Sequence, residues 1–84
     1  MEIKKINIKK LDDGSQLKAF VEVETDIFRL WDVKVLERGG ELMVALPSKK
    51  KKKRDGRCKY FPYIRFSREN WDKLKHAVIE EYLR

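Results

Sequence analysis

The stretch LKAFVEVET, Leu17–Thr25, decides the fold of this 84-residue chain. Its odd positions are apolar as far as Val23, whereas its even positions are charged, with Phe20 as the exception. A period of two is typical of a β-strand that turns one face toward a core and the other toward water. The sequence therefore predicts a strand over residues 17–25 that belongs to a sheet with one covered face.

The segment before this strand predicts its hairpin partner. Residues 3–11 place Ile6 and Ile8 in phase among lysines, which indicates a strand with a charged rim. Asp12–Ser15 has the composition of a turn, because Asp bonds its own backbone and Gly accepts a positive φ. We therefore expect strands 3–11 and 17–25 to form a hairpin.

The segment after it, residues 27–36, changes phase midway. Phe28 and Leu30 occupy even positions, whereas Val33 and Val35 occupy odd ones. A slip of one residue reverses the two faces of a strand. We therefore expect a bulge or a two-sided environment near Trp31 and Asp32.

A fourth strand is expected over residues 41–46. Gly39 and Gly40 supply the hairpin turn that precedes it. Leu42–Leu46 is apolar in both phases, which predicts a central strand covered on both faces.

The fifth strand is expected over residues 57–66, after a basic loop over residues 47–56. Pro47 ends the fourth strand, and Asp55–Gly56 is the turn signal at the end of the loop. Pro62 donates no ladder hydrogen bond, so we expect this strand to lie at an edge or to be bulged.

The C-terminal segment predicts an amphipathic helix over residues 68–83. Ser67 is the expected N-cap, and Glu69 lies in the first turn, where the helix dipole favours a carboxylate. An apolar stripe along one side predicts contact with the sheet. The stripe comprises Trp71, Leu74, Val78 and Tyr82. Ile79 and Leu83 fall outside it, so we expect a partner helix or a second subunit to cover them.

These elements predict an α+β fold, a five-stranded antiparallel meander packed by one C-terminal helix, in a single domain over residues 1–84. No stretch approaches the roughly 18 apolar residues of a membrane span. No apolar segment follows the N-terminal charges, as a signal peptide would require. We therefore expect a soluble, cytoplasmic protein.

Residues suited to catalysis or metal binding are few. The chain has one cysteine, Cys58, and one histidine, His76, which excludes an internal disulfide and offers no metal-ligand spacing. Cys58 shares the phase of Tyr60 and Ile64, which predicts a small buried side chain, and His76 falls on the polar helix face. We therefore expect a non-enzymatic protein with no metal, cofactor or small-molecule substrate.

The positive charge is concentrated in one segment. Between Pro47 and Tyr60 eight basic residues accompany one acidic residue, Asp55, and the resulting +7 equals the formal charge of the whole chain. The basic residues are Lys49, Lys50, Lys51, Lys52, Lys53, Arg54, Arg57 and Lys59. This pattern predicts a polyanion-binding site on a neutral scaffold. A solvated loop that aids solubility would have the same composition.

Lysine and arginine predict different contacts within such a site. Lysine is a flexible point charge suited to phosphates, whereas the guanidinium fork reads guanine or stacks on a base. The lysine run therefore predicts affinity more than specificity. Discrimination between sequences would come from Arg54, Arg57, Arg65 or Arg68.

Two aromatic residues interleave with these cations. Phe61 and Tyr63 occupy the same phase as Lys59 and Arg65, which makes them candidates for stacking on unpaired bases. The alternative is that both rings pack under a loop or in a dimer interface. No RNA-recognition signature accompanies them.

Several short motifs are spread over almost the whole chain, and the most specific is Leu42–Lys49, LMVALPSK. The others are Leu17–Ala19, Trp31–Val35, Asp55–Gly56, Phe61–Ile64 and Ala77–Tyr82. Together they resemble the SpoVG family of bacterial regulators, whose signature Leu42–Lys49 matches nearly position by position. The family usually has histidine where Trp31 and Phe61 stand, and its basic loop is shorter.

This resemblance implies a small, homodimeric, non-enzymatic protein that binds DNA, and in some members RNA, to modulate gene expression. It implies contacts by the basic loop, which begins at Lys49, and by the start of the helix at Arg68 and Lys73. A second class stays open, in which the loop docks on an anionic membrane or an acidic protein.

Overall fold

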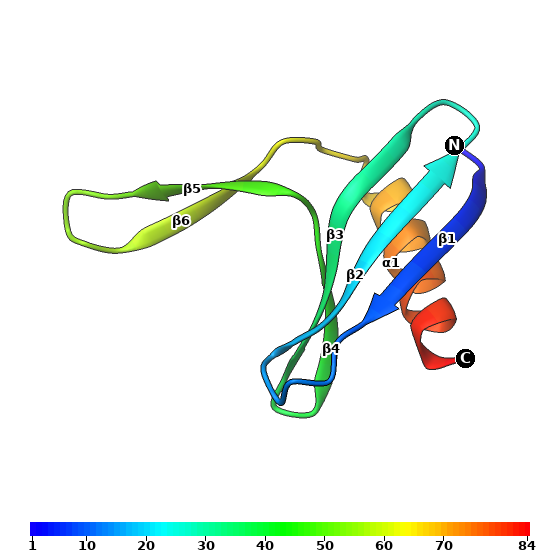
Figure 1. The fold of residues 1–84 in the computed structure, drawn as a ribbon. Helices are drawn as coiled ribbons and strands as arrows, with labels where there is room; N and C mark the ends of the chain where they lie inside the picture. Colours follow the sequence, from blue (N-terminus) through cyan, green and yellow to red (C-terminus); the bar gives the residue numbers. More distant parts are fainter.

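The computed structural model describes the backbone of all 84 residues, and the side chains of all except Tyr60, Phe61 and Pro62. The elements are β1 Ile3–Lys10, β2 Leu17–Thr25, β3 Arg29–Arg38, β4 Glu41–Ala45, β5 Ser48–Lys52, β6 Cys58–Pro62 and α1 Arg68–Leu83. Strands β1 to β4 form one antiparallel sheet in chain order, and β5 pairs with β6 in a separate two-stranded sheet (Figure 1). The predicted α+β class, with an antiparallel sheet and one C-terminal helix, is confirmed, with one strand more than expected.

The core lies between one face of the four-stranded sheet and α1. The alternating apolar residues of β2 supply its centre, because Ala19, Val21 and Val23 are buried. From the helix, Leu74 and Val78 meet them, so the predicted apolar stripe is confirmed. α1 contacts β1 and β4, the two outer strands, and therefore lies across the whole sheet.

A bulge interrupts the pairing of β2 with β3. Val21 lies opposite Val33, but Val23 lies opposite Leu30, so two residues of β3 face a single position of β2. The extra residue is accommodated at Asp32, whose φ is +60°. The bulge lets both Leu30 and Val33 face the core, which confirms the irregularity predicted from the change of phase.

The fourth strand differs from its prediction. β4 is at the edge of the sheet, beyond β3, and not at its centre. Val44 faces the core, whereas Met43 is 44% exposed on the face that α1 does not cover. The prediction was wrong because a strand that is apolar in both phases can also have one face on a sheet surface that remains open.

The region expected to be a basic loop contains a strand. β5 occupies Ser48–Lys52, and its partner β6 is shorter than the strand expected over residues 57–66. The extra strand forms because these backbone groups pair with β6 from Ser48 opposite Pro62 to Lys52 opposite Cys58. Lysine side chains do not prevent this pairing, since they extend into solvent.

The start of α1 is fixed by a cap and by aromatic packing. Ser67 is the N-cap, as predicted, and its hydroxyl oxygen accepts a hydrogen bond of 3.2 Å from the N–H of Asn70. The ring of Phe66 stacks on Trp71, with centroids 6.5 Å apart, and contacts Phe28 at 5.8 Å. These contacts set where the chain returns from the two-stranded sheet to the core.

Candidate nucleic-acid interface

The hairpin of β5 and β6, residues 48–62, projects away from the four-stranded sheet, and we call it the basic arm (Figure 1). A tight turn closes its tip, where the N–H of Lys53 donates to the carbonyl of Arg57 at 2.7 Å. Asp55 accepts a hydrogen bond of 3.0 Å from the Arg57 N–H, and Gly56 has a φ of +86°. The sequence Asp-Gly therefore serves the turn here, as predicted.

The base of the basic arm is closed by one backbone hydrogen bond. The N–H of Tyr63 donates to the carbonyl of Pro47 at 3.0 Å. This bond joins the two ends of the hairpin at the point where the backbone continues to β4 on one side and to α1 on the other. Pro47 itself donates no hydrogen bond. The arm is thus held by paired backbone along its whole length.

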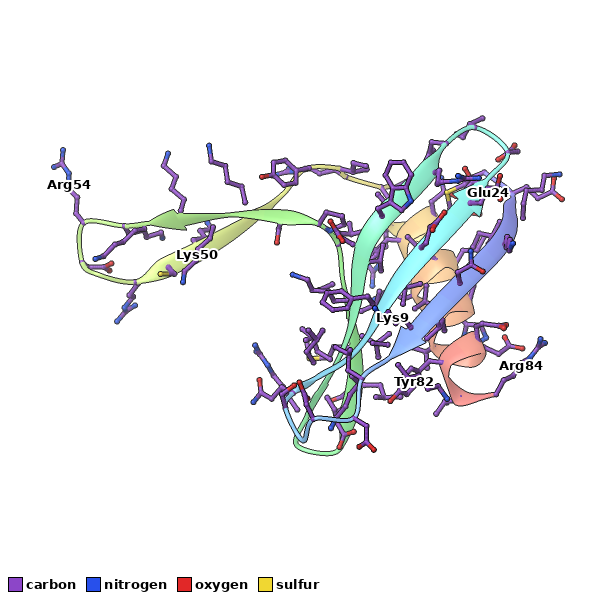
Figure 2. All side chains as sticks on the ribbon, viewed as in Figure 1. Lys9, Glu24, Lys50, Arg54, Tyr82 and Arg84 are labelled. Atoms are coloured by element: carbon purple, nitrogen blue, oxygen red, sulfur yellow. The ribbon has the colours of Figure 1, made fainter. Side chains whose placement is uncertain are left out.

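The lysines of β5 point in two directions. All five β5 residues are exposed, and alternate side chains of a strand leave opposite faces. Lys50 and Lys52 share one face, and Lys49 and Lys51 share the other. Figure 2 shows basic side chains leaving both faces of the arm, with Lys50 along it and Arg54 at its tip.

Arg57 and Asp55 form a salt bridge within the basic arm. Arg57 Nε lies 3.7 Å from Asp55 Oδ2, a contact between two exposed groups that contributes little to stability. Among the side chains that the structure describes, no carboxylate forms a salt bridge with Lys49, Lys50, Lys51, Lys52, Lys53 or Arg54. These six side chains therefore present their positive charge to solvent.

Three of the predicted contact residues lie outside the basic arm. Arg65 is exposed in the connection between β6 and α1, and Arg68 is exposed at the first residue of α1. Lys73 lies one turn further along the helix, and its Nζ donates a hydrogen bond of 3.0 Å to the carbonyl of Met1. The structure thus places residues 49–59 together on the arm, whereas the ammonium group of Lys73 is hydrogen-bonded to the backbone of Met1.

The residues considered for stacking and catalysis fall as follows. Tyr63 is 69% exposed beside the base of the basic arm, whereas the side chain of Phe61 lies outside the described residues. Cys58 is exposed, so the prediction of a buried side chain was wrong, because the hairpin that contains it projects away from the four-stranded sheet. His76 lies on the polar face of α1, as predicted, and its Nε2 lies 3.7 Å from Glu80 Oε2.

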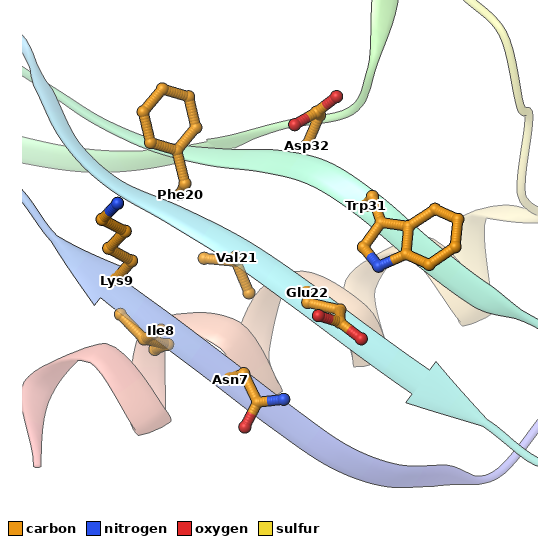
Figure 3. Close-up of a pocket in the computed structure, with 8 residues that line it drawn as sticks. All are labelled: Asn7, Ile8, Lys9, Phe20, Val21, Glu22, Trp31 and Asp32. Atoms are coloured by element: carbon orange, nitrogen blue, oxygen red, sulfur yellow. The ribbon is translucent and has the colours of Figure 1, made fainter.

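A second surface was not predicted from the sequence. The face of the sheet opposite α1 carries a groove of about 560 Å³, lined by Asn7, Ile8, Lys9, Phe20, Val21, Glu22, Trp31 and Asp32 (Figure 3). Trp31 is 60% exposed there. The signal in the sequence was Phe20, an aromatic residue in an otherwise charged phase. The groove is lined by basic and acidic side chains, whereas the charged residues of the arm are basic except for Asp55.

Two other features bear on function. Within the described part of the chain, no group of three or more His, Cys, Asp or Glu side chains is placed to hold a metal ion. α1 is also neither long nor apolar enough to cross a membrane.

Comparison with known proteins identifies relatives along nearly the full length. The sequence matches the SpoVG family over residues 1–84. A protein of Caldanaerobacter subterraneus subsp. tengcongensis is 34% identical over 83 residues, which are 98% of this chain and 88% of that protein. A protein of Desulforudis audaxviator is 32% identical over 83 residues, which are 98% of this chain and 91% of that protein. Both carry the name "Putative septation protein SpoVG".

Proposed function

The chain belongs to the SpoVG family, and we propose that it is a non-enzymatic nucleic-acid-binding protein that regulates gene expression. The observation that carries this proposal is the basic arm, an exposed hairpin with eight basic residues and one acidic residue between Pro47 and Tyr60. Double-stranded DNA is the expected ligand, with RNA as a second one. A projecting element of one sign of charge is suited to a partner with a dense, regular array of the opposite sign.

Phosphate contacts account for the affinity. Each phosphate that a lysine or arginine neutralises releases condensed counterions, which favours binding at low salt. The lysines of β5 supply charge without reading bases, whereas Arg54, Arg57, Arg65 and Arg68 supply forked donors. Tyr63, with Phe61, adds a stacking surface for unpaired bases where a strand is open.

The proposed active form is a homodimer. Leu83 is 67% exposed at the end of α1, and Trp31 and Met43 are exposed on the sheet face that α1 leaves uncovered. A second copy of the chain packed on one of these two surfaces would remove its apolar side chains from water and place two basic arms on one nucleic acid. Sedimentation that shows only a species of 10.1 kDa at high micromolar concentration would contradict this part of the proposal.

The proposed setting follows from the names of the relatives. Proteins named for septation match almost the whole chain. The protein would therefore act in the cytoplasm, as a transcriptional regulator of genes for septation or sporulation.

A second function has one observation in its favour. The lysines of the basic arm are exposed point charges, and an anionic membrane or an acidic protein surface attracts such charges as well. In this case the arm would be an electrostatic docking element.

A salt titration separates the two functions. Binding is measured to a short DNA duplex, a single strand, an RNA of the same sequence and vesicles with anionic lipid. Nucleic-acid binding through roughly five contacts gives a log-log slope of about −4 to −5 on the duplex. Changing Lys49–Lys53 to glutamine should abolish most of this slope. Equal competition by the vesicles, or unchanged binding by the variant, would overturn the proposed function.

A further inference from the structure

The basic arm carries lysines on both of its faces, although a flat surface could contact only one of them. Lys50 and Lys52 leave one face, and Lys49 and Lys51 leave the other, where Lys59 lies opposite Lys51. No element of the described structure packs on either face of β5, all of whose residues are exposed. A ligand that neutralises both faces must therefore surround the arm with phosphates.

We propose that the basic arm enters the major groove of B-form DNA with its tip first. One face of the hairpin then lies toward one phosphate backbone, and the other face lies toward the other backbone. This inference rests on the proposed function and specifies its ligand and its geometry. It makes duplex DNA, and not duplex RNA, the partner of the arm.

The dimensions of the arm select this groove. Sheets that pack face to face lie about 10 Å apart, so a ribbon with side chains on both faces is about 10 Å thick. The major groove of B-DNA is about 12 Å wide and admits a two-stranded ribbon, whereas the minor groove is about 6 Å wide. The major groove of an RNA duplex is deep and too narrow for side chains to read.

The arm is also long enough and free to reach the groove. Five paired residues at about 3.3 Å per residue extend it roughly 16 Å from its base. It leaves the sheet on the side away from α1 (Figure 1), so the body of the protein does not block its two faces. Arg54 at the tip is the residue that penetrates furthest.

Two double variants with equal charge loss test the geometry. Lys50→Gln with Lys52→Gln removes two lysines from one face, and Lys49→Gln with Lys51→Gln removes two from the other. If the arm lies between two backbones, each pair lowers the salt slope by about 1.8, since each phosphate contact contributes about 0.9. If one pair changes the slope and the other leaves it unchanged, the arm docks by a single face and the inference is wrong.

Matched controls separate folding from contact. Lys4→Gln with Lys5→Gln removes the same charge from β1, the sheet edge furthest from β4 and the arm, and should leave the slope unchanged. None of the arm's described side chains belongs to the core, so all these variants should keep the far-UV circular dichroism of the unmodified protein.

The groove itself is tested with modified duplexes. DNA whose cytosines carry a glucosylated hydroxymethyl group has a filled major groove and should lose binding at physiological salt, whereas netropsin, which fills the minor groove, should leave binding unchanged. The opposite result would overturn the inference while duplex binding by the arm, and with it the proposed function, would stand. If the protein shows no salt-dependent binding to any nucleic acid, both the inference and the proposed function are wrong.

Discussion

Lys51 of β5 lies directly opposite Lys59 of β6 in the pairing of the basic arm. Like charges in directly opposite positions of an antiparallel pair destabilise it. A polyanion that bound the arm as proposed would reduce this repulsion, so we expect binding and ordering of the arm to be coupled through this pair.

Reversing one of these charges should stabilise the arm and weaken its binding. Lys51→Glu places opposite charges across the hairpin, which contributes roughly 0.2–1 kcal/mol. Amide hydrogen exchange of β5 and β6 should slow, while affinity for duplex DNA falls. Lys50→Glu makes the same charge change opposite Tyr60 and should weaken binding without slowing exchange. Equal exchange in the two variants would contradict the role assigned to the Lys51–Lys59 pair.

The bulge in β3 should depend on the residue at position 32. Asp32 has a φ of +60°, a conformation that costs a β-branched residue about 1–2 kcal/mol or more. Asp32→Val should therefore lower the midpoint of urea unfolding, and Asp32→Gly should leave it unchanged or raise it slightly. If valine is tolerated as well as glycine, the left-handed backbone at this position is not required by the fold.

Two leucines of α1 offer a matched test of the core. Leu74 is 1% exposed beneath the sheet, so Leu74→Ala should reduce the free energy of unfolding by about 2–5 kcal/mol. Leu83 is 67% exposed, so Leu83→Ala should change it by less than about 0.5 kcal/mol in the monomer. A larger effect of Leu83→Ala that grows with protein concentration would place Leu83 in the dimer interface.

Stability at acid pH should respond to Asp26. Its carboxylate accepts a hydrogen bond of 2.8 Å from the N–H of Glu2, which lowers its pKa below the usual 3.8, although desolvation acts in the opposite direction. A folded-state pKa below the unfolded one gives stability that is present above about pH 4 and is lost as pH falls through the folded value. Asp26→Asn should therefore flatten the acid limb of urea midpoints measured from pH 6 to pH 2. An acid limb unchanged by the substitution would assign the acid sensitivity to other carboxylates.

The parts of the fold that pack on one side could be predicted from the sequence. β2 alternates because only one of its faces meets α1, and the stripe of the helix repeats for the same reason. The bulge was visible because Leu30 and Val33 could both reach the core only if the register shifted.

The rest could not be predicted, because the residues lack a pattern. In β5 every position after Ser48 is lysine, so the sequence shows no alternation there and predicts a loop. β4 is apolar on both faces, which does not distinguish a central strand from an edge strand with an open face. For the candidate site, the sequence located the charge, whereas its division between two faces depends on pairing with β6.

Because no described side chain of the basic arm belongs to the core, the residues that stabilise the fold and the residues proposed to bind the ligand lie in separate parts of the chain. Its length and its charge can therefore change without loss of the scaffold, provided that residues are added or removed in register on both strands. In such a chain, the length of the arm and its affinity for a polyanion can change in small steps while the domain that carries the arm stays folded.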